Sequence, residues 1–151
     1  MNLQETVDQI RKKFPDAILE ASSFREEDTL RVRAEDLLPL CQFLRDTPVF
    51  AFDYLVDLCG VDRYPKEPRF EVVYLLRSMK RKAMLRLKVA LPGDDPRIGS
   101  VTAVWKGADW MEREAYDLLG IRFEGHPDLR RILLTPEWQG HPLRKDYPLR
   151  G

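Results

Sequence analysis

A helical pattern that stops at a glycine and runs into a proline-rich segment constrains this chain more than any other feature. Residues 110–119 read WMEREAYDLL, and Gly120 follows them. Glycine commonly ends a helix because it adopts the left-handed conformation without steric strain. Residues 121–151 contain four prolines, which cannot donate to a sheet ladder. We therefore expect a platform over residues 1–120 and an extended arm over residues 121–151, within one domain unit.

The apolar residues of this helix share one face. At about 100° per residue, that face carries Ala108, Met111, Ala115, Leu118 and Leu119. Three charged residues are expected to point away from it: Asp109, Arg113 and Asp117.

Glu112 falls within the apolar face, where an unpaired buried charge is costly. Either the pKa of Glu112 rises or an arginine pairs with it, and the nearest candidates along the chain are Arg130, Arg131 and Arg144. The alternative is that Glu112 lies at the edge of the stripe and extends to water.

Composition limits the class of protein. The chain has 151 residues, of which 44% are hydrophobic, and this suits one globular domain. Lys plus Arg and Asp plus Glu number 25 each, so no general field attracts nucleic acid or an anionic membrane. Apolar runs are only strand-length and the N-terminus is polar, which predicts a cytosolic chain held to a membrane, if at all, through a partner.

The two cysteines, Cys41 and Cys59, lie in apolar surroundings without CxxC spacing. We expect both to be core thiols in a reducing compartment. Two thiolates also fall short of the four that an iron–sulfur cluster usually needs.

Hydrophobic periodicity predicts a series of helices and strands before the arm. We expect helices at 2–13 and 35–46, strands at 17–21, 29–33, 50–61, 70–77 and 83–89, and a helical segment from Ser100 that carries Val101, Val104 and Trp105. Residues 22–28 are expected to form a turn, residues 62–68 and 92–96 loops, and Lys80–Lys82 a basic hairpin turn. The strand at 70–77 is expected to be central and the one at 83–89 edge-like. This order predicts an α+β domain with a mainly antiparallel sheet packed by helices.

The arm contains a short internal repeat. Residues 125–131 read GHPDLRR and residues 140–145 read GHPLRK. In each copy proline favours an extended turn, after which a leucine and two basic side chains follow. Trp138 and the arginines belong to the residue types that anchor protein interfaces, so the arm is expected to dock onto a partner.

A metal or hydrolytic site is the weaker alternative. Glu112, His126 and His141, with Glu114 and Asp128 nearby, resemble a set of metal ligands. However, the histidines lack helical i, i+4 spacing and each precedes a proline. The chain also lacks a glycine-rich phosphate loop and a nucleophile elbow. A nucleic-acid module based on residues 80–82 and the basic arm lacks aromatic platforms.

Several motifs together resemble a known family. They are Ser100-Val101-Thr102, Trp105, Ala108-Asp109-Trp110, Glu112-Arg113-Glu114, Asp117-Leu118-Leu119, His126, Arg130, Ile132-Leu133 and residues 140–148, with residues 52–55, Asp57 and 60–62 upstream. This pattern resembles the 30-kDa subunit family of respiratory complex I, whose members are the C subunit of bacterial NADH:quinone oxidoreductase and the J subunit of the plastid type. The resemblance covers the chain from about Leu37. Lys106-Gly107 departs from it, because relatives often carry a proline there.

The resemblance implies a structural subunit without cofactors in the peripheral arm of a proton-translocating complex. Such a subunit would pack against the 49-kDa quinone-site subunit, called the D subunit in bacteria, and near the cluster-bearing B and I subunits. FMN and iron–sulfur clusters would carry electrons from NADH to quinone in those partners, at the cytoplasmic face of the membrane. Two alternatives remain: the equivalent subunit of a membrane-bound hydrogenase or a ferredoxin- or F420-linked complex, and a freestanding metal-dependent hydrolase using Glu112, His126 and His141.

No catalytic, cofactor-binding or metal-binding residue is assigned. The candidate signature and interface residues are Glu112, Arg113, Glu114, Asp117, Gly120, His126, Pro127, Arg130, Arg131, Trp138, His141, Pro142, Arg144, Lys145 and Asp146.

Overall fold

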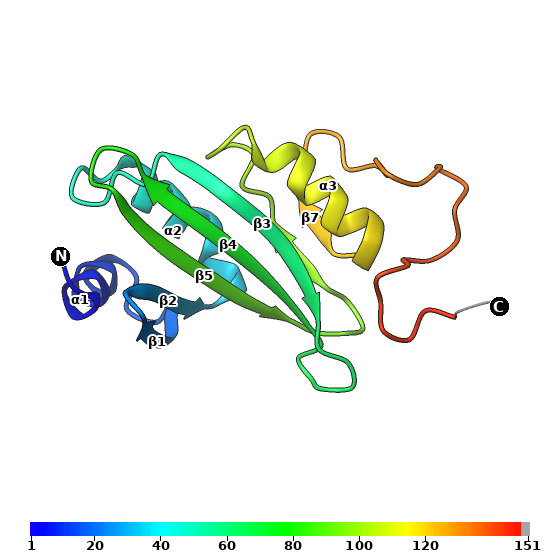
Figure 1. Cartoon of the computed structure of the whole chain (residues 1–151), viewed down its shortest axis with the longest axis horizontal. Coiled ribbons are helices and arrows are strands. Elements are labelled where there is room, and N and C mark those ends of the chain that lie inside the picture. The colour runs from blue at the N-terminus through cyan, green and yellow to red at the C-terminus, as the bar shows by residue number, and fades with distance from the viewer. Residues whose placement is uncertain (149–151) are drawn as a thin grey trace.

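A five-stranded sheet with the strand order β1-β2-β5-β4-β3 forms the centre of this computed structural model, which describes residues 1–148 (Figure 1). The strands are β1 (Ile18–Phe24), β2 (Glu27–Val32), β3 (Tyr54–Asp62), β4 (Phe70–Ser78) and β5 (Ala83–Leu91), with a separate short pair, β6 (Arg97–Gly99) and β7 (Arg122–Glu124). The helices are α1 (Leu3–Lys13), the 3-10 turn η1 (Ala34–Asp36), α2 (Leu37–Asp46) and α3 (Ala108–Leu119). Within the large sheet only β2 and β5 run parallel, which confirms a mainly antiparallel α+β fold.

The first hairpin is tighter than the sequence suggested. Residues 22–28 were expected to form a turn, but β1 continues to Phe24 and β2 begins at Glu27. Only Arg25 and Glu26 form the turn, with φ angles of 50° and 66°. Two successive left-handed residues match the twist of the flanking strands, so pairing continues to the turn despite the polar composition of these residues.

The expectation that residues 83–89 form an edge strand is wrong. The β4–β5 hairpin is present as expected, but β2 pairs in parallel with the other side of β5, so β5 is central. Its polar residues Arg86 and Lys88 remain partly exposed because the helices cover only the opposite face of the sheet. Beside it, β4 is interior as expected, and the edge strands are β1 and β3.

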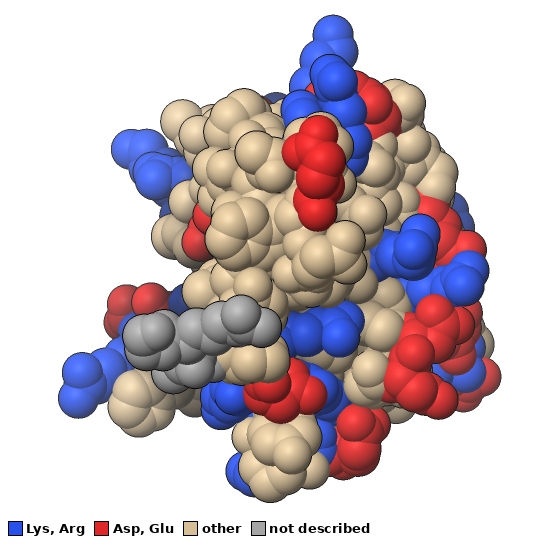
Figure 2. All heavy atoms as spheres, turned by 90° about the vertical axis from the view of Figure 1, so that its right-hand side faces the viewer, with Lys and Arg blue, Asp and Glu red and all other residues tan. Residues whose placement is uncertain are grey.

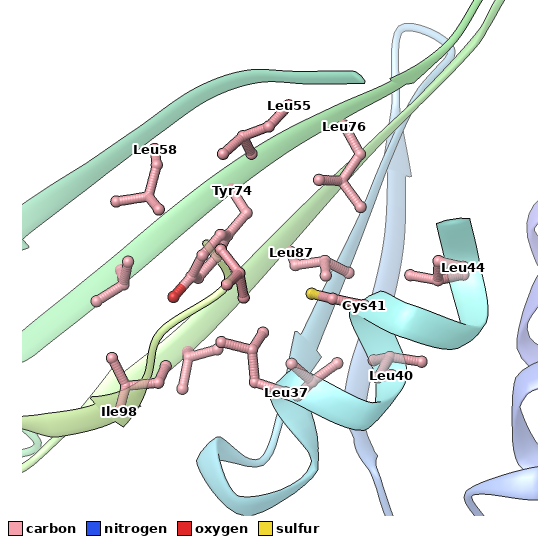
Figure 3. Close-up of a cluster of buried hydrophobic side chains, with 14 of the residues drawn as sticks. Leu37, Leu40, Cys41, Leu44, Leu55, Leu58, Tyr74, Leu76, Leu87 and Ile98 are labelled. Atoms are coloured by element: carbon pink, nitrogen blue, oxygen red, sulfur yellow. The ribbon is translucent and has the colours of Figure 1, made fainter. Parts of the chain in front are cut away.

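The core lies between the sheet and α2. Figure 3 shows Leu37 and Cys41 of α2 facing Tyr74 of β4 and Leu87 of β5, and all four residues are buried. The expectation of two core cysteines is wrong for Cys59, which is exposed on β3. Strand alternation turns Cys59 toward the uncovered face of the sheet.

Two further expectations need correction. The strand expected at 50–61 begins only at Tyr54, because residues 50–53 form an irregular connection in which Ala51 has a φ angle of 48°. The segment after Ser100 is a turn in place of a helix. There the Trp105 indole donates to the Phe52 carbonyl oxygen at 3.1 Å, so a tertiary contact determines the path of the chain.

None of the helices in residues 1–148 is both long enough and apolar enough to cross a membrane. The last three residues of the expected arm, 149–151, lie outside the described residues.

Candidate functional site: the junction of α3 and the arm

Helix α3 packs against β3 and ends where the arm begins. Gly120 ends it in the left-handed conformation, with φ at 78°, as the sequence predicts. The next residues do not extend away, because Ile121 and Phe123 are buried and β7 pairs with β6. The extended part of the arm therefore starts at Gly125 and passes around α3 (Figure 1).

Asp117 ties the arm to α3. Its Oδ2 accepts backbone N–H bonds from Ile132, Leu133 and Leu134 at 3.1, 2.8 and 2.9 Å, and its Oδ1 accepts from Arg131 Nη1 at 2.6 Å. Asp117 was expected to point away from the packed face, but this expectation is wrong because the residue is fully buried. A helical wheel treats that side as solvent, whereas the arm returns to cover it.

The hydrogen bonds to Asp117 favour its charged form. Burial alone would raise the pKa of Asp117, but the N–H groups of Leu134 and Leu133 and the Arg131 guanidinium outweigh it, so the pKa is lowered. The carboxylate is therefore a buried anion with matched donors.

The repeat at 140–145 satisfies the open carbonyl groups at the end of α3. The Leu143 N–H donates to the Leu118 oxygen at 2.9 Å, and Arg144 Nε donates to the Leu119 oxygen at 2.7 Å. His141 Nδ1 lies 2.9 Å from the Asp117 carbonyl oxygen, which can only accept, so this nitrogen carries the proton. Burial lowers the pKa of His141, which favours the neutral ring. The arm thus replaces the water that usually solvates a helix end.

A second anchor joins the arm to the ends of β3 and β4. Buried Arg69 donates to Asp62 Oδ1 at 2.8 Å and to Asp146 Oδ1 at 2.7 Å. The Lys145 N–H donates to Asp62 Oδ2 at 2.7 Å. The Arg69 guanidinium holds the pKa of Asp62 far below its usual range and also lowers that of Asp146. The ion pairs therefore fasten the distal arm to the platform.

Glu112 is buried, and none of the expected arginines pairs with it. Ser100 Oγ donates to its Oε1 at 2.6 Å and the Val101 N–H donates to its Oε2 at 2.8 Å. Both the arginine pair and the solvent-exposed alternative are therefore wrong. Burial raises the pKa of Glu112, and the bonds from Ser100 and Val101 offset only part of that effect. The side chain joins α3 to the turn that precedes it, which explains why Ser100 does not cap a helix.

The residues of the alternative metal site are directed to separate partners. His126 Nδ1 accepts from the Asp128 N–H at 2.9 Å, and its Nε2 lies 3.0 Å from Asp109 Oδ1. His141 contacts the end of α3 and Glu112 contacts the turn before it. Within residues 1–148, no three His, Cys, Asp or Glu side chains form a group suited to a metal ion.

The remaining candidate residues divide into anchors and exposed positions. Arg113 donates to the carbonyl oxygens of Arg130 and Arg131 at 3.3 and 3.4 Å, so it also holds the arm. Pro142 is partly buried. Exposed candidates are Glu114, Pro127, Arg130, Trp138, Lys145 and Asp146, of which Arg130 pairs with Asp128 and Asp146 with Arg69.

Three anchoring residues were absent from the candidate set: Asp62, Arg69 and Ser100. Asp62 and Ser100 lie in the segments that carry the family resemblance, which was the available signal. No pattern in the sequence pointed to Arg69, because only the fold brings its partners Asp62 and Asp146 together.

The outer side of the arm exposes large apolar side chains. Leu133, Trp138 and Leu143 are 53%, 43% and 59% exposed, and Trp110 on α3 is 56% exposed. Figure 2 shows this end of the molecule, where uncharged residues cover a broad area and charged side chains gather mainly toward its lower and right-hand parts. The arm is therefore polar on its inner contacts and partly apolar outside.

Relatives of this chain match it over most of its length. The C subunit of NADH-quinone oxidoreductase from Geotalea uraniireducens is 49% identical over 142 residues, which cover 94% of this chain and 85% of the relative. The NADH-quinone oxidoreductase C 2 subunit of Rhizobium meliloti is 53% identical over 120 residues, which cover 80% of this chain and 65% of the relative.

Two solved structures are also similar. One, described as the trypsin-resistant fragment (1–134) of Nqo5, has a TM-score of 0.70 and 30% identity, covering 85% of this chain and 100% of that one. The other is the membrane-bound sulfane sulfur reductase, described as an archaeal respiratory membrane complex, with a TM-score of 0.79, 29% identity and coverage of 97% and 85%. The model of the family described as the respiratory-chain NADH dehydrogenase 30 Kd subunit matches residues 30–151. The chain belongs to this 30 Kd subunit family.

Proposed function

We propose that this chain is a structural subunit, without cofactors of its own, in the peripheral arm of a proton-translocating NADH:quinone oxidoreductase. The observation that carries the proposal is the two-sided construction of the arm. Asp117 and Arg69 fasten its inner side to the platform, while Leu133 and Trp138 face outward. Such a segment is held in shape before a partner arrives, which reduces the entropy lost on binding.

The partner that we propose for the outer side is the 49-kDa quinone-site subunit, the D subunit of the bacterial complex, with the cluster-bearing B and I subunits nearby. FMN and the iron–sulfur clusters would reside in partner subunits, and the chain would be peripheral at the cytoplasmic face of the membrane. Support comes from the relatives, which are named as C subunits of NADH-quinone oxidoreductase. In this role the chain braces the proteins that conduct electrons and performs no reaction itself.

A second candidate is the equivalent subunit of a different membrane-bound complex. The similarity to a chain of the membrane-bound sulfane sulfur reductase favours it, since that match covers 97% of this chain. Purifying the complex through a tag on this chain and identifying the electron-input subunits by mass spectrometry separates the two. NADH-oxidising subunits support the first candidate, whereas hydrogenase- or reductase-type subunits support the second.

Deleting residues 136–151 tests the docking role of the arm. We expect the truncated chain to keep its sheet and helices, measured by circular dichroism, but to lose co-purification with the 49-kDa subunit. The similar Nqo5 structure is described as a trypsin-resistant fragment, and its whole length is covered by 85% of this chain. A truncated chain that still co-purifies stoichiometrically contradicts the proposal.

A point substitution makes the test sharper. Trp138→Ala removes an exposed aromatic residue from the arm, and Phe24→Ala removes one, 69% exposed, from the distant β1–β2 hairpin. Loss of an interface anchor typically costs about 2 kcal/mol or more, so we expect Trp138→Ala to weaken co-purification strongly. The Phe24→Ala control should leave it unchanged.

A further inference from the structure

Strand β3 leaves one edge of the large sheet open. Among residues 1–148, it is the last strand of the sheet and pairs only with β4 (Figure 1). The Arg63 N–H donates to the Arg69 oxygen at 2.8 Å, which sets the alternation of the ladder. In an antiparallel pair, every second residue of a strand directs its backbone N–H and C=O groups to the same neighbour. Counting back from Arg63, the backbone groups of Cys59 therefore pair with β4, whereas those of Leu58 and Gly60 point to the open edge.

The open edge is short and partly guarded. A register shift between Leu55 and Asp57 interrupts the strand on one side. Asp57 Oδ1 accepts from the Leu58 N–H at 2.9 Å, which satisfies one of the edge donors in the free chain. Bulges and charged side chains of this kind limit indiscriminate pairing of edge strands. Among residues 1–148, no backbone hydrogen bond joins Gly60 to an element outside the sheet.

A groove of about 300 Å³ runs between this edge and α3. Apolar side chains form its walls, namely Met111, Ala115 and Leu118 of α3 and Leu143 of the arm. Its charged residues are Asp57 and Glu114, which are both acidic and both exposed. The groove thus offers backbone hydrogen bonds on one side, apolar contacts on the other, and negative charge.

We propose that this groove binds an extended segment of a neighbouring subunit, which adds to β3 as a further strand. The backbone groups of Gly60 and the carbonyl group of Leu58 at the open edge require an extended partner. The apolar wall of α3 requires apolar side chains on it, and Asp57 with Glu114 requires at least one Lys or Arg. Trp138 does not line this groove, so the groove is a second contact in the same assembly and rests on the proposed subunit role.

A second copy of this chain is the less suitable occupant. Pairing two β3 edges would bring Asp57 and Glu114 of each copy toward the same acidic residues of the other, and like charges across an interface are unfavourable. The arm of the same chain does not fill the groove either. Its backbone at Leu143 already bonds to the Leu118 oxygen at the end of α3.

Amide hydrogen exchange tests the proposal directly. The free chain and the complex purified through a tag on this chain are compared, with fragmentation that resolves single amides. We expect the Gly60 amide to exchange at least about tenfold more slowly in the complex. Cys59 is the internal reference, because its amide is already paired with β4 in the free chain.

Charge reversal gives an independent measurement. Glu114→Lys is expected to reduce recovery of the partner subunits by about tenfold at low salt, because it turns attraction for a basic segment into repulsion. Asp94→Lys makes the same charge change in the loop before β6 and should leave recovery unchanged. Circular dichroism establishes that both variants are folded.

The outcomes separate the two proposals. A complex that assembles while Gly60 exchanges as in the free chain overturns the groove proposal and leaves the proposed function standing. Protection of Gly60 that appears in the free chain as its concentration rises, with a dimer in sedimentation, also overturns it by showing a second copy as the occupant. A wild-type chain that co-purifies with no other subunit overturns the proposed function itself.

Discussion

Two buried carboxylates on α3 show how the surroundings of a residue decide its charge. Asp117 receives donors from three backbone N–H groups and from Arg131, and its pKa is lowered. Glu112 receives one hydroxyl and one N–H group, and burial raises its pKa. The number and charge of the donors account for the opposite directions. The arm supplies the donors to Asp117, so arm position and carboxylate charge are coupled.

Asp117→Asn should loosen the arm. The NH2 group of an asparagine at this position would point either at Arg131 or at the N–H groups of the arm, and all of these are donors. At least one charge-assisted hydrogen bond is therefore lost. We expect a loss of about 1–3 kcal/mol in the free energy of unfolding, measured by urea denaturation. Asp128→Asn, in an exposed pair with Arg130, is the control and should change little.

The same variant has a signature in pH. Because the folded-state pKa of Asp117 lies below the ordinary value of 3.8, the unfolded chain binds its proton first as the pH falls. Its contribution to stability is present above that value and is lost as the pH falls toward the folded pKa. The slope of unfolding free energy against pH should be smaller for Asp117→Asn below about pH 5. Equal slopes would show that the arm does not stabilise the carboxylate.

Glu112→Gln should show the opposite pH effect. The folded-state pKa of Glu112 lies above the ordinary 4.5, so the folded chain retains a proton that the unfolded chain has released. The free energy of unfolding of the wild type therefore falls as the pH rises from about 4.5 to the folded-state pKa of Glu112, and the variant should lack this fall. Glutamine can keep both contacts, because its Oε1 can accept from the Val101 N–H and its Nε2 can donate to the Ser100 hydroxyl, so the two chains should differ little in stability at low pH, where the wild-type carboxyl is also neutral. Urea denaturation across the range measures both, with exposed Glu114→Gln as control.

At the scale of elements, the approach of α3 to β3 depends on one small residue. A Cβ atom at Gly60 would lie 2.6 Å from Leu119 Cδ1 and 3.0 Å from Ile121 Cδ1. Both neighbours are buried core residues and cannot turn away into solvent. Gly60 therefore sets the distance between helix and sheet, and with it the width of the groove at the open edge.

Gly60→Ala should destabilise the chain by about 1–3 kcal/mol, as expected for overpacking of a close-packed core. Gly107→Ala is the matched control, since a Cβ atom there meets nothing within 4 Å and its φ of −63° suits alanine. That control should be neutral or slightly stabilising. Denaturation midpoints of the two variants provide the comparison, and an unaffected Gly60→Ala chain would show that α3 shifts freely.

At the scale of the whole molecule, the arm is held at points far apart in the sequence. Asp117 fixes residues 131–134, the end of α3 fixes residues 141–144, and Arg69 fixes Asp146. Between these points Trp138 remains exposed. The molecule thus presents one face of the arm in a defined shape, as the proposed docking role requires.

Arg69→Gln should release the distal anchor. Removing the guanidinium leaves Asp62 buried without its main partner, and the contact with Asp146 is lost. If the anchor stabilises the docked distal arm relative to the released arm by about 1.4 kcal/mol, trypsin should cleave the variant after Arg144 or Lys145 about tenfold faster than the wild type. Mass spectrometry of a digestion time course measures this. Arg97→Gln, in an exposed pair with Asp95, should digest like the wild type, and equal rates for both variants would rule out the anchor.

The sequence by itself determined the features that depend on neighbours along the chain. The end of α3 at Gly120, the β4–β5 hairpin and the mainly antiparallel α+β class follow from periodicity and turn chemistry, and the family from the motifs that resemble its members. The docking role of Trp138 stays a prediction. Only the tertiary structure decided the central place of β5, the exposure of Cys59, and the partners of Asp117, Glu112 and Arg69. Those depend on contacts between distant segments, since burial and hydrogen bonding are set by whatever the fold brings alongside.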